Sequence, residues 1–313
     1  MSPLPPGDLP GGRYLDLEGR GTTFYRRVEG PAGAPTVLLL HGWTATSALN
    51  WYSSFGPLGE RYDVVAIDHR GHGHGIRSDE PFTLEDCADD AAALVEALGL
   101  GPVIAVGYSM GGPIAQLLWR RHRELVAGLV LCATARNFVG VGAGDRAFKG
   151  VVTGLSFVAR AAPARLHRRV TDRVLVSRYD DSELGRWARR EARHNSLRHL
   201  VEAGRAIGQF SSREWIGEVD VPTAVVLTEH DLVVPPVRQR KLAAAIPGAT
   251  VHPVDGGHDV CATAPERFVP ALLAALDSVA VRLAGRRPGA APAPSPAPGD
   301  PAPRPGEAPA PPR

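Results

Sequence analysis

Short apolar runs alternate with helical patterns along most of this chain, and this alternation constrains the fold more than any other feature. The later runs are almost continuously apolar, as parallel strands buried on both faces are. Strand–helix alternation of this kind predicts an α/β fold with a mostly parallel central sheet flanked by helices. The predicted strands are Thr22–Val28, Thr36–Leu40, Val64–Ile67, Val103–Val106, Leu129–Cys132, Ala224–Leu227 and Thr250–Val254.

Helical periodicity fills the stretches between these strands. Thr83 stands where an N-cap is expected, with Asp86 three residues further on. Thr263 and Glu266 have the spacing of a capping box before the last helix. Pro270 is expected to bend that helix or to mark its start. Two further helices are predicted over Met110–Arg121 and Val234–Ile246.

Composition divides the chain into a core and three other segments. Residues 1–12 and 285–313 are rich in Pro with Gly or Ala and lack apolar periodicity, so we expect both to be disordered. Between residues 137 and 220 no convincing strand is found, and helical patterns predict an inserted helical cap. The core is then expected to combine residues 13–136 with residues 221–284.

The net charge of +2 gives no global reason to expect nucleic acid or a membrane surface as a partner. The chain has only three cysteines, which argues against a disulfide framework and fits a reducing compartment. The N-terminus lacks the basic start and apolar run of a secretory signal, and no stretch approaches the ~18 apolar residues of a membrane-spanning helix. We therefore expect a cytoplasmic protein; composition does not predict its oligomeric state.

The sequence GYSMG at residues 107–111 follows a predicted strand and opens a predicted helix. G-x-S-x-G in that context is a nucleophile elbow. A serine on so tight a turn has a strained backbone, and the flanking glycines remove side chains that would collide there. Ser109 is therefore the predicted nucleophile, presented at the C-terminal edge of the sheet.

Acyl transfer through a tetrahedral intermediate requires two hydrogen-bond donors aimed at the developing oxyanion. The backbone N–H of Met110, the residue after the nucleophile, is the first candidate. The second is the backbone N–H of Trp43, because an apolar strand runs directly into His41-Gly42-Trp43. His41 is expected to buttress this loop rather than to take part in the chemistry.

A serine nucleophile needs a base and an acid that orients the base. In chains with a nucleophile elbow, the acid follows the serine in sequence and the histidine base comes last. Asp231 follows the strand before last and is the predicted acid, with Glu229 as its rival. His258 follows the last strand and two glycines and is the predicted base. Its rival, His252, lies within the strand pattern itself.

Three histidines, His69, His72 and His74, lie in a glycine-rich loop after a predicted strand and invite comparison with a metal site. Their spacing is irregular for a dedicated site, and no cysteine or paired carboxylate joins them. A structural role of this loop is favoured. We therefore expect neither a metal nor an organic cofactor.

Five motifs in order resemble the α/β-hydrolase superfamily over about residues 20–282: LLLHGW at 38–43, DHRGHG at 68–73, GYSMGG at 107–112, TEHDLVVP at 228–235 and GGH at 256–258. The resemblance implies the α/β-hydrolase fold and its serine-nucleophile branch. Haloalkane dehalogenases and epoxide hydrolases carry Asp where this chain has Ser109. The HGW and GYSMGG pieces are similar to small carboxylesterases and to cofactor-free haloperoxidases or perhydrolases.

From these residues we expect a carboxylic ester hydrolase that acts on a small or medium-sized substrate through an acyl-enzyme, with Ser109, Asp231 and His258 as its triad. Two alternatives stay open. The same triad can transfer the acyl group to hydrogen peroxide or another alcohol, or the fold can serve as a non-catalytic ligand receptor. The predicted cap has no familiar sequence, so it predicts neither the acyl chain nor the leaving group.

Overall fold

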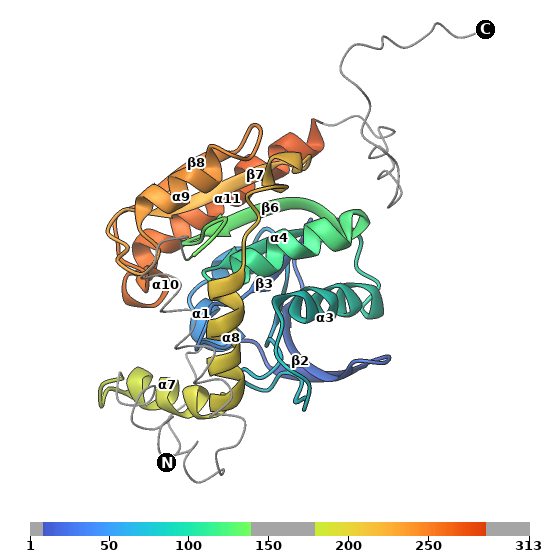
Figure 1. Ribbon diagram of the computed structural model, residues 1–313, viewed down its shortest axis with the longest axis vertical. Helices are drawn as coiled ribbons and strands as arrows, with labels where there is room; N and C mark the ends of the chain where they lie inside the picture. Colours follow the sequence, from blue (N-terminus) through green and yellow to red (C-terminus); the bar gives the residue numbers. More distant parts are fainter. Residues whose placement is uncertain (1–8, 139–178, 286–313) are drawn as a thin grey trace, which may run out of the picture.

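A computed structural model describes residues 9–138 and 179–285, whose strands form one eight-stranded sheet (Figure 1). The strand order is β1-β2-β4-β3-β5-β6-β7-β8. β1 pairs antiparallel with β2, β2 pairs antiparallel with β4, and all other neighbours are parallel. The strands are β1 (Gly12–Leu17), β2 (Gly21–Val28), β3 (Thr36–Leu40), β4 (Asp63–Ile67), β5 (Val103–Tyr108), β6 (Val126–Cys132), β7 (Thr223–Thr228) and β8 (Thr250–Val254).

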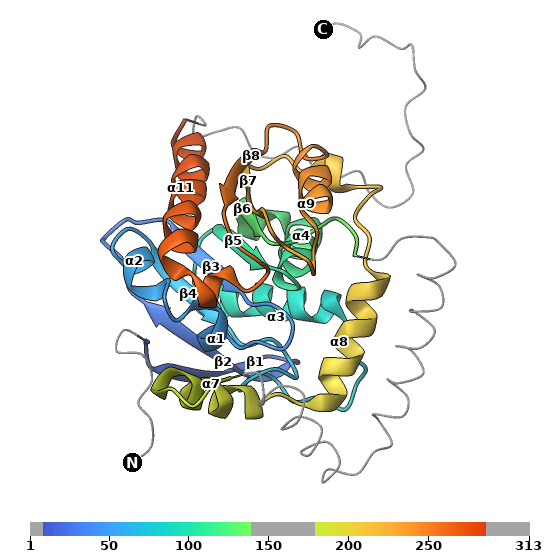
Figure 2. The same ribbon diagram turned by 90° about the vertical axis from the view of Figure 1, so that its left-hand side faces the viewer.

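Helices cover both faces of this sheet, with α2 and α11 on one side and α3, α4 and α9 on the other (Figure 2). The predicted α/β-hydrolase fold is therefore confirmed. The helices are α1 (Ser47–Trp51), α2 (Phe55–Gly59), α3 (Leu84–Ala97), α4 (Gly111–Arg121), α7 (Glu183–Arg193), α8 (Leu197–Gln209), α9 (Pro236–Ala243), α10 (Val260–Thr263) and α11 (Pro265–Ala284), with 3₁₀ turns η1 (Arg123–Leu125) and η3 (Ile216–Glu218).

The central strands are apolar on both faces because each face packs against helices. In β3, Val37 and Leu39 pack in the cluster that includes α11, whereas Leu38 and Leu40 pack in the cluster that includes α3 and α4. All four side chains are fully buried. Burial of each such side chain contributes about 1.5–3 kcal/mol relative to leaving it exposed. These strands therefore form a stable core that positions the loops at their ends.

Two predicted helix starts have different outcomes. Thr83 caps α3 as predicted, since its Oγ1 accepts a hydrogen bond from the Asp86 N–H at 3.0 Å. The capping box at Thr263 is wrong, because Thr263 Oγ1 donates to the Asp259 carbonyl instead. α11 begins at Pro265, whose ring fixes a helical φ without requiring a side-chain cap, and it continues through Pro270.

The edge strand β1 was not predicted. It begins at Gly12, inside the segment expected to be disordered, and only Leu17 of its six residues is buried. An exposed hairpin strand carries little apolar periodicity, so the sequence pattern gave no signal.

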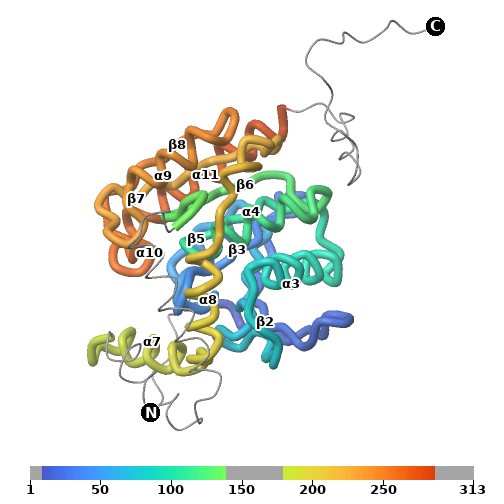
Figure 3. Tube along the Cα trace, viewed as in Figure 1, coloured from blue at the N-terminus to red at the C-terminus, as the bar shows by residue number. Residues whose placement is uncertain are grey.

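Of the predicted cap, residues 137–138 and 179–220 are described, and the latter hold α7, α8 and η3. α7 packs Trp187 against Ala48 and Leu49 of α1. Figure 3 follows α8 from α7 towards the segment that enters β7. The rest of the predicted cap and of both predicted disordered ends, residues 1–8, 139–178 and 286–313, lies outside the described residues. No helix in the described ranges is long and apolar enough to cross a membrane.

Candidate active site

Ser109 occupies the turn between β5 and α4 with a left-handed backbone, φ +52°. Its N–H donates to the Cys132 carbonyl at 2.9 Å, and its own carbonyl accepts from Thr134 Oγ1 at 2.8 Å. A Cβ on Gly107 would lie 2.2 Å from the Gly111 carbonyl oxygen, and a Cβ on Gly111 would lie 2.0 Å from that of Leu40. Both glycines are thus required by close backbone approach, which holds the strained serine in place.

The structure brings the three predicted triad residues into one hydrogen-bonded chain. Ser109 Oγ lies 2.9 Å from His258 Nε2, and His258 Nδ1 lies 2.7 Å from Asp231 Oδ2. Asp231 is buried, while the His258 side chain is 22% exposed. In this arrangement Nδ1–H donates to the carboxylate, which leaves Nε2 free to accept the serine proton.

The Asp231 carboxylate is held by several donors besides His258. The backbone N–H groups of Val233 and Val234 donate to Oδ1 at 2.8 and 2.7 Å, and Thr228 Oγ1 donates to Oδ2 at 2.8 Å. Burial alone would raise the pKa of Asp231, but the hydrogen bonds and the charge of His258 outweigh it and lower that pKa below its usual value. The acid is therefore ionised and fixed in orientation at neutral pH.

Gln239, on α9, contacts the loop that carries Asp231, which the sequence did not predict. It is fully buried, and its Nε2 donates to Thr228 Oγ1 at 2.7 Å and to the Val234 carbonyl at 2.8 Å. Its Oε1 accepts from the Thr228 N–H at 3.1 Å. One side chain thus ties together both ends of the loop that carries Asp231.

Replacing Gln239 by Leu is expected to lower kcat/KM about tenfold and to destabilise the fold by about 1–3 kcal/mol, because buried groups at Thr228 and Val234 lose their partner. Steady-state kinetics and urea unfolding measure the two effects. Arg240→Leu, at the next and exposed position of the same helix, is the matched control. Wild-type kcat/KM in folded Gln239→Leu would show that the amide does not position the acid.

The rival residues lie elsewhere. Glu229 is exposed. His252 lies on β8 with its Nε2 3.1 Å from Thr250 Oγ1. Of these four candidates, Asp231 and His258 are the two that form the described hydrogen-bonded chain with Ser109.

Tyr108, the residue before Ser109, holds the loop that carries His258. Its hydroxyl donates to the His258 carbonyl at 2.7 Å, so the residue before Ser109 anchors the loop that carries His258. Burial raises the pKa of Tyr108, which keeps it a neutral donor. Tyr108 occupies a variable position of the G-x-S-x-G motif, so the sequence did not predict this contact.

The predicted oxyanion loop lies against Ser109. A Cβ on Gly42 would lie 3.3 Å from Ser109 Cβ, so the Gly42–Trp43 peptide passes directly beside the serine. The Gly42 N–H donates to Asn50 Oδ1 at 2.8 Å, a contact that the sequence did not predict. Met110 follows the serine and is fully buried. The two predicted oxyanion donors thus stand on the two segments that flank Ser109.

His41 supports this loop from behind. Its Nε2 accepts the His69 N–H at 3.0 Å, which leaves Nδ1 as the protonated nitrogen, 2.8 Å from the Gly42 carbonyl oxygen. The glycine-rich loop after β4 is fixed in turn by Asp68, which accepts from the N–H groups of Ser47 and His74 at 2.7 and 2.9 Å. Within the described residues no cluster of His, Cys, Asp or Glu has a metal-binding arrangement.

Buried histidines predict that the protein loses stability in mild acid. Burial lowers the pKa of His41, His69 and His72, which are all essentially inaccessible to solvent. These rings stay neutral in the fold below pH 6.5, whereas the unfolded chain binds a proton on each. Each such ring removes up to about 1.4 kcal/mol of unfolding free energy per pH unit below pH 6.5.

We therefore expect the free energy of unfolding, measured in urea, to be greatest at or above pH 7 and to fall steeply from pH 6.5 to pH 5. His69→Leu should reduce the slope of the unfolding free energy with pH by the contribution of about one bound proton. The substitution breaks no hydrogen bond, since neither ring nitrogen of His69 has a partner in the described part of the chain. Constant stability between pH 7 and pH 5 would contradict these burial effects.

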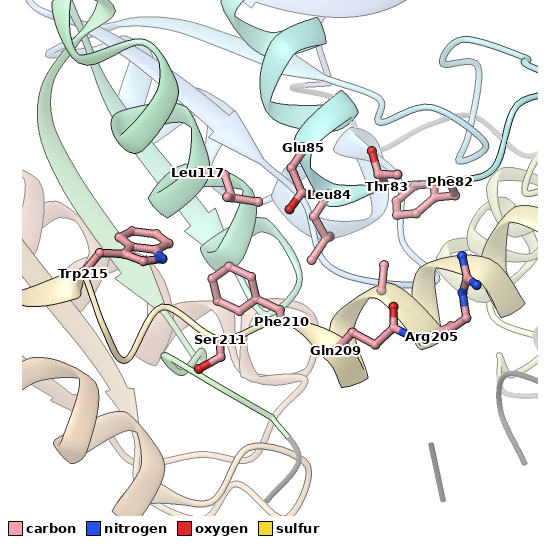
Figure 4. A pocket seen from close by; sticks show the side chains of 11 residues that line it. Phe82, Thr83, Leu84, Glu85, Leu117, Arg205, Gln209, Phe210, Ser211 and Trp215 are labelled. Atoms are coloured by element: carbon pink, nitrogen blue, oxygen red, sulfur yellow. The ribbon is translucent and has the colours of Figure 1, made fainter. Parts of the chain in front are cut away.

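A pocket of about 290 Å³ lies apart from the triad, between α8 and the start of α3 (Figure 4). Phe82, Leu84, Leu117, Phe210 and Trp215 give it apolar walls, and Ala206 lies on its α8 side. None of the triad residues lines it. The pocket is therefore separate from the site formed by Ser109, His258 and Asp231.

This chain is similar over most of its length to proteins of known fold. A family model described as the alpha/beta hydrolase fold matches residues 35–265. A protein described as the carbamate hydrolase RutD of Agrobacterium fabrum is 29% identical over 247 residues, 77% of this chain and 93% of that protein. The enol-lactonase of Burkholderia xenovorans has a TM-score of 0.70 at 24% identity, covering 85% of this chain and all of that one. An esterase of Thermogutta terrifontis has a TM-score of 0.66 at 23% identity, covering 86% and 99%.

The family match spans most of the chain, and it includes the nucleophile elbow, the oxyanion loop and the loops that carry Asp231 and His258. The solved structures show the same fold. The chain belongs to the alpha/beta hydrolase family.

Proposed function

We propose that this hydrolase cleaves a carboxylic ester of a small or medium-sized substrate through an acyl-enzyme formed on Ser109. The observation that carries the proposal is the continuous hydrogen-bonded chain from Ser109 Oγ through His258 to the buried carboxylate of Asp231. Buried, free cysteines support a reducing compartment such as the cytoplasm.

The first half of the reaction forms the acyl-enzyme. Ser109 Oγ attacks the ester carbonyl carbon while His258 Nε2 takes the hydroxyl proton. The Asp231 carboxylate stabilises the imidazolium, and the N–H groups of Trp43 and Met110 stabilise the oxyanion. His258 then delivers its proton to the alkoxide oxygen, the C–O bond breaks, and the alcohol leaves.

The second half returns the free enzyme. Water attacks the acyl carbon, and His258 Nε2 takes one of its protons. The second tetrahedral intermediate collapses, the Ser109 oxygen leaves with the proton from His258, and a carboxylic acid is released. No metal or organic cofactor takes part in this scheme.

A carbamate is the second candidate substrate class. RutD of Agrobacterium fabrum, which is described as a carbamate hydrolase, matches 77% of this chain over 93% of its own length. A carbamate carbonyl passes through the same kind of tetrahedral intermediate, so the same side chains serve for either substrate.

Product analysis tests the proposal. With p-nitrophenyl acetate, p-nitrophenyl butyrate and a p-nitrophenyl carbamate, we expect turnover of at least the esters, with carboxylic acid as the main product in water. Hydrogen peroxide or methanol, added at a millimolar concentration equal to that of the substrate, should leave the carboxylic acid as the main product. Dominant peracid or methyl ester would identify acyl transfer instead, and absence of turnover on all three substrates would favour a receptor.

A further inference from the structure

The side chain of Trp43 leaves the oxyanion loop and lies on α8. Its Nε1–H donates to the Leu200 carbonyl at 2.8 Å. A Cβ built on Gly204, one turn further along the same helix, would lie 3.0 Å from Cζ2 and 3.3 Å from Cη2 of the indole. The benzo ring of Trp43 therefore rests where α8 carries no side chain.

Gly204 stands in the interior of α8, which has 13 residues. A glycine in a helix interior lowers helix stability relative to alanine, so its presence there requires a specific reason. Its φ is not positive, so an alanine could adopt the same backbone conformation. Close approach of the indole is the constraint that the structure shows at this position.

Other contacts hold the oxyanion loop at the residues on either side of Trp43. On the core side, Asn50 holds the Gly42 N–H and His41 holds the Gly42 carbonyl. On the opposite side, Asn195, between α7 and α8, donates to the Thr44 carbonyl at 3.3 Å. The peptide N–H of Trp43 lies between these two sets of contacts, with the indole–α8 contact next to it.

We propose that α8 is a positioning element for the oxyanion hole. The packing of Trp43 on Gly204, together with its hydrogen bond to Leu200, sets the direction of the Trp43 backbone N–H beside Ser109. This inference rests on the proposed function. Loss of a whole oxyanion donor lowers kcat about 10²–10³-fold, so a shift of a few tenths of an ångström in this N–H should lower kcat about tenfold.

Gly204→Ala is the first test. The added methyl group displaces the indole, so we expect kcat to fall about tenfold while KM stays within twofold. The melting temperature should be unchanged or higher, because alanine favours the helix. Ala206→Val is the matched control, since it adds volume to α8 on the side of the pocket in Figure 4 and should keep kcat within twofold.

A double-mutant cycle separates positioning from a general effect on the helix. Phenylalanine lacks Nε1, Cζ2 and Cη2, so Trp43→Phe alone should lower kcat, and Gly204→Ala added to it should cost nothing more. An equal loss from Gly204→Ala in both backgrounds, or wild-type kcat in Gly204→Ala, would overturn the proposal. Ser109→Ala distinguishes the two levels: if that variant remains active, the proposed function itself fails.

Discussion

Ser109→Ala should lower kcat/KM for p-nitrophenyl butyrate by about 10⁴–10⁶-fold while leaving the fold intact. The loss is this large because Oγ is the atom that forms the acyl bond, and removal of the serine alone costs about as much as removal of the whole triad. The hydroxyl has one described side-chain partner, His258, so its deletion disturbs no structural network. Steady-state kinetics and thermal unfolding measure the two parts of the prediction.

Ser109→Gly is the companion variant. Glycine tolerates the φ of +52° that the turn imposes, so this variant should be as inactive as the alanine variant and somewhat more stable than the wild type. A rise in stability together with loss of activity is the behaviour expected of a strained catalytic residue. If either variant hydrolyses the ester at the wild-type rate, another residue is the nucleophile.

Asp231→Asn should lower kcat about 10⁴-fold near pH 7. Oδ1 accepts from the N–H groups of Val233 and Val234, so the asparagine oxygen is expected to occupy that position and its NH₂ group the position of Oδ2. The NH₂ group then faces His258 Nδ1 and stabilises the tautomer with the proton on Nε2. That tautomer cannot accept the proton of Ser109.

The matched control for this variant is Asp255→Asn. Asp255 precedes His258 by three residues, but it pairs with His230 and Arg267 at the surface. We expect wild-type kcat in Asp255→Asn and a folded, nearly inactive Asp231→Asn, measured from pH 6 to pH 9. Comparable losses in both variants, or a loss of less than tenfold in Asp231→Asn, would show that Asp231 is not the orienting acid.

The arrangement of the site could be predicted from sequence because parallel strands bring distant loops to one edge. Ser109, Asp231 and His258 each follow a strand, and the carboxyl ends of parallel strands meet at the same edge of the sheet. Local patterns for strand, turn and helix were therefore sufficient to predict which side chains would meet. The same patterns predicted the α3 start at Thr83, where the cap is a local contact.

Contacts between segments far apart in sequence could not be predicted in this way. The bond from Trp43 to Leu200 joins residues 157 positions apart, and nothing in either local sequence indicates the other. Gln239 and Asn50 are polar residues in short helices, and only the packed structure shows that they face inward to hold Asp231 and Gly42. The local sequence pattern also gave a wrong prediction at Thr263. The capping box predicted there does not form, and α11 begins at Pro265 without a side-chain cap.

Covalent labelling tests the central claim most directly, which is that Ser109 is activated by His258 and Asp231. The full chain is treated with a fluorophosphonate, which phosphonylates an activated serine, and is then studied by intact mass and peptide mapping. We expect one adduct per chain, on Ser109, absent in Ser109→Ala and formed much more slowly in Asp231→Asn. An adduct on another residue, or labelling of Ser109→Ala at the wild-type rate, would contradict the account.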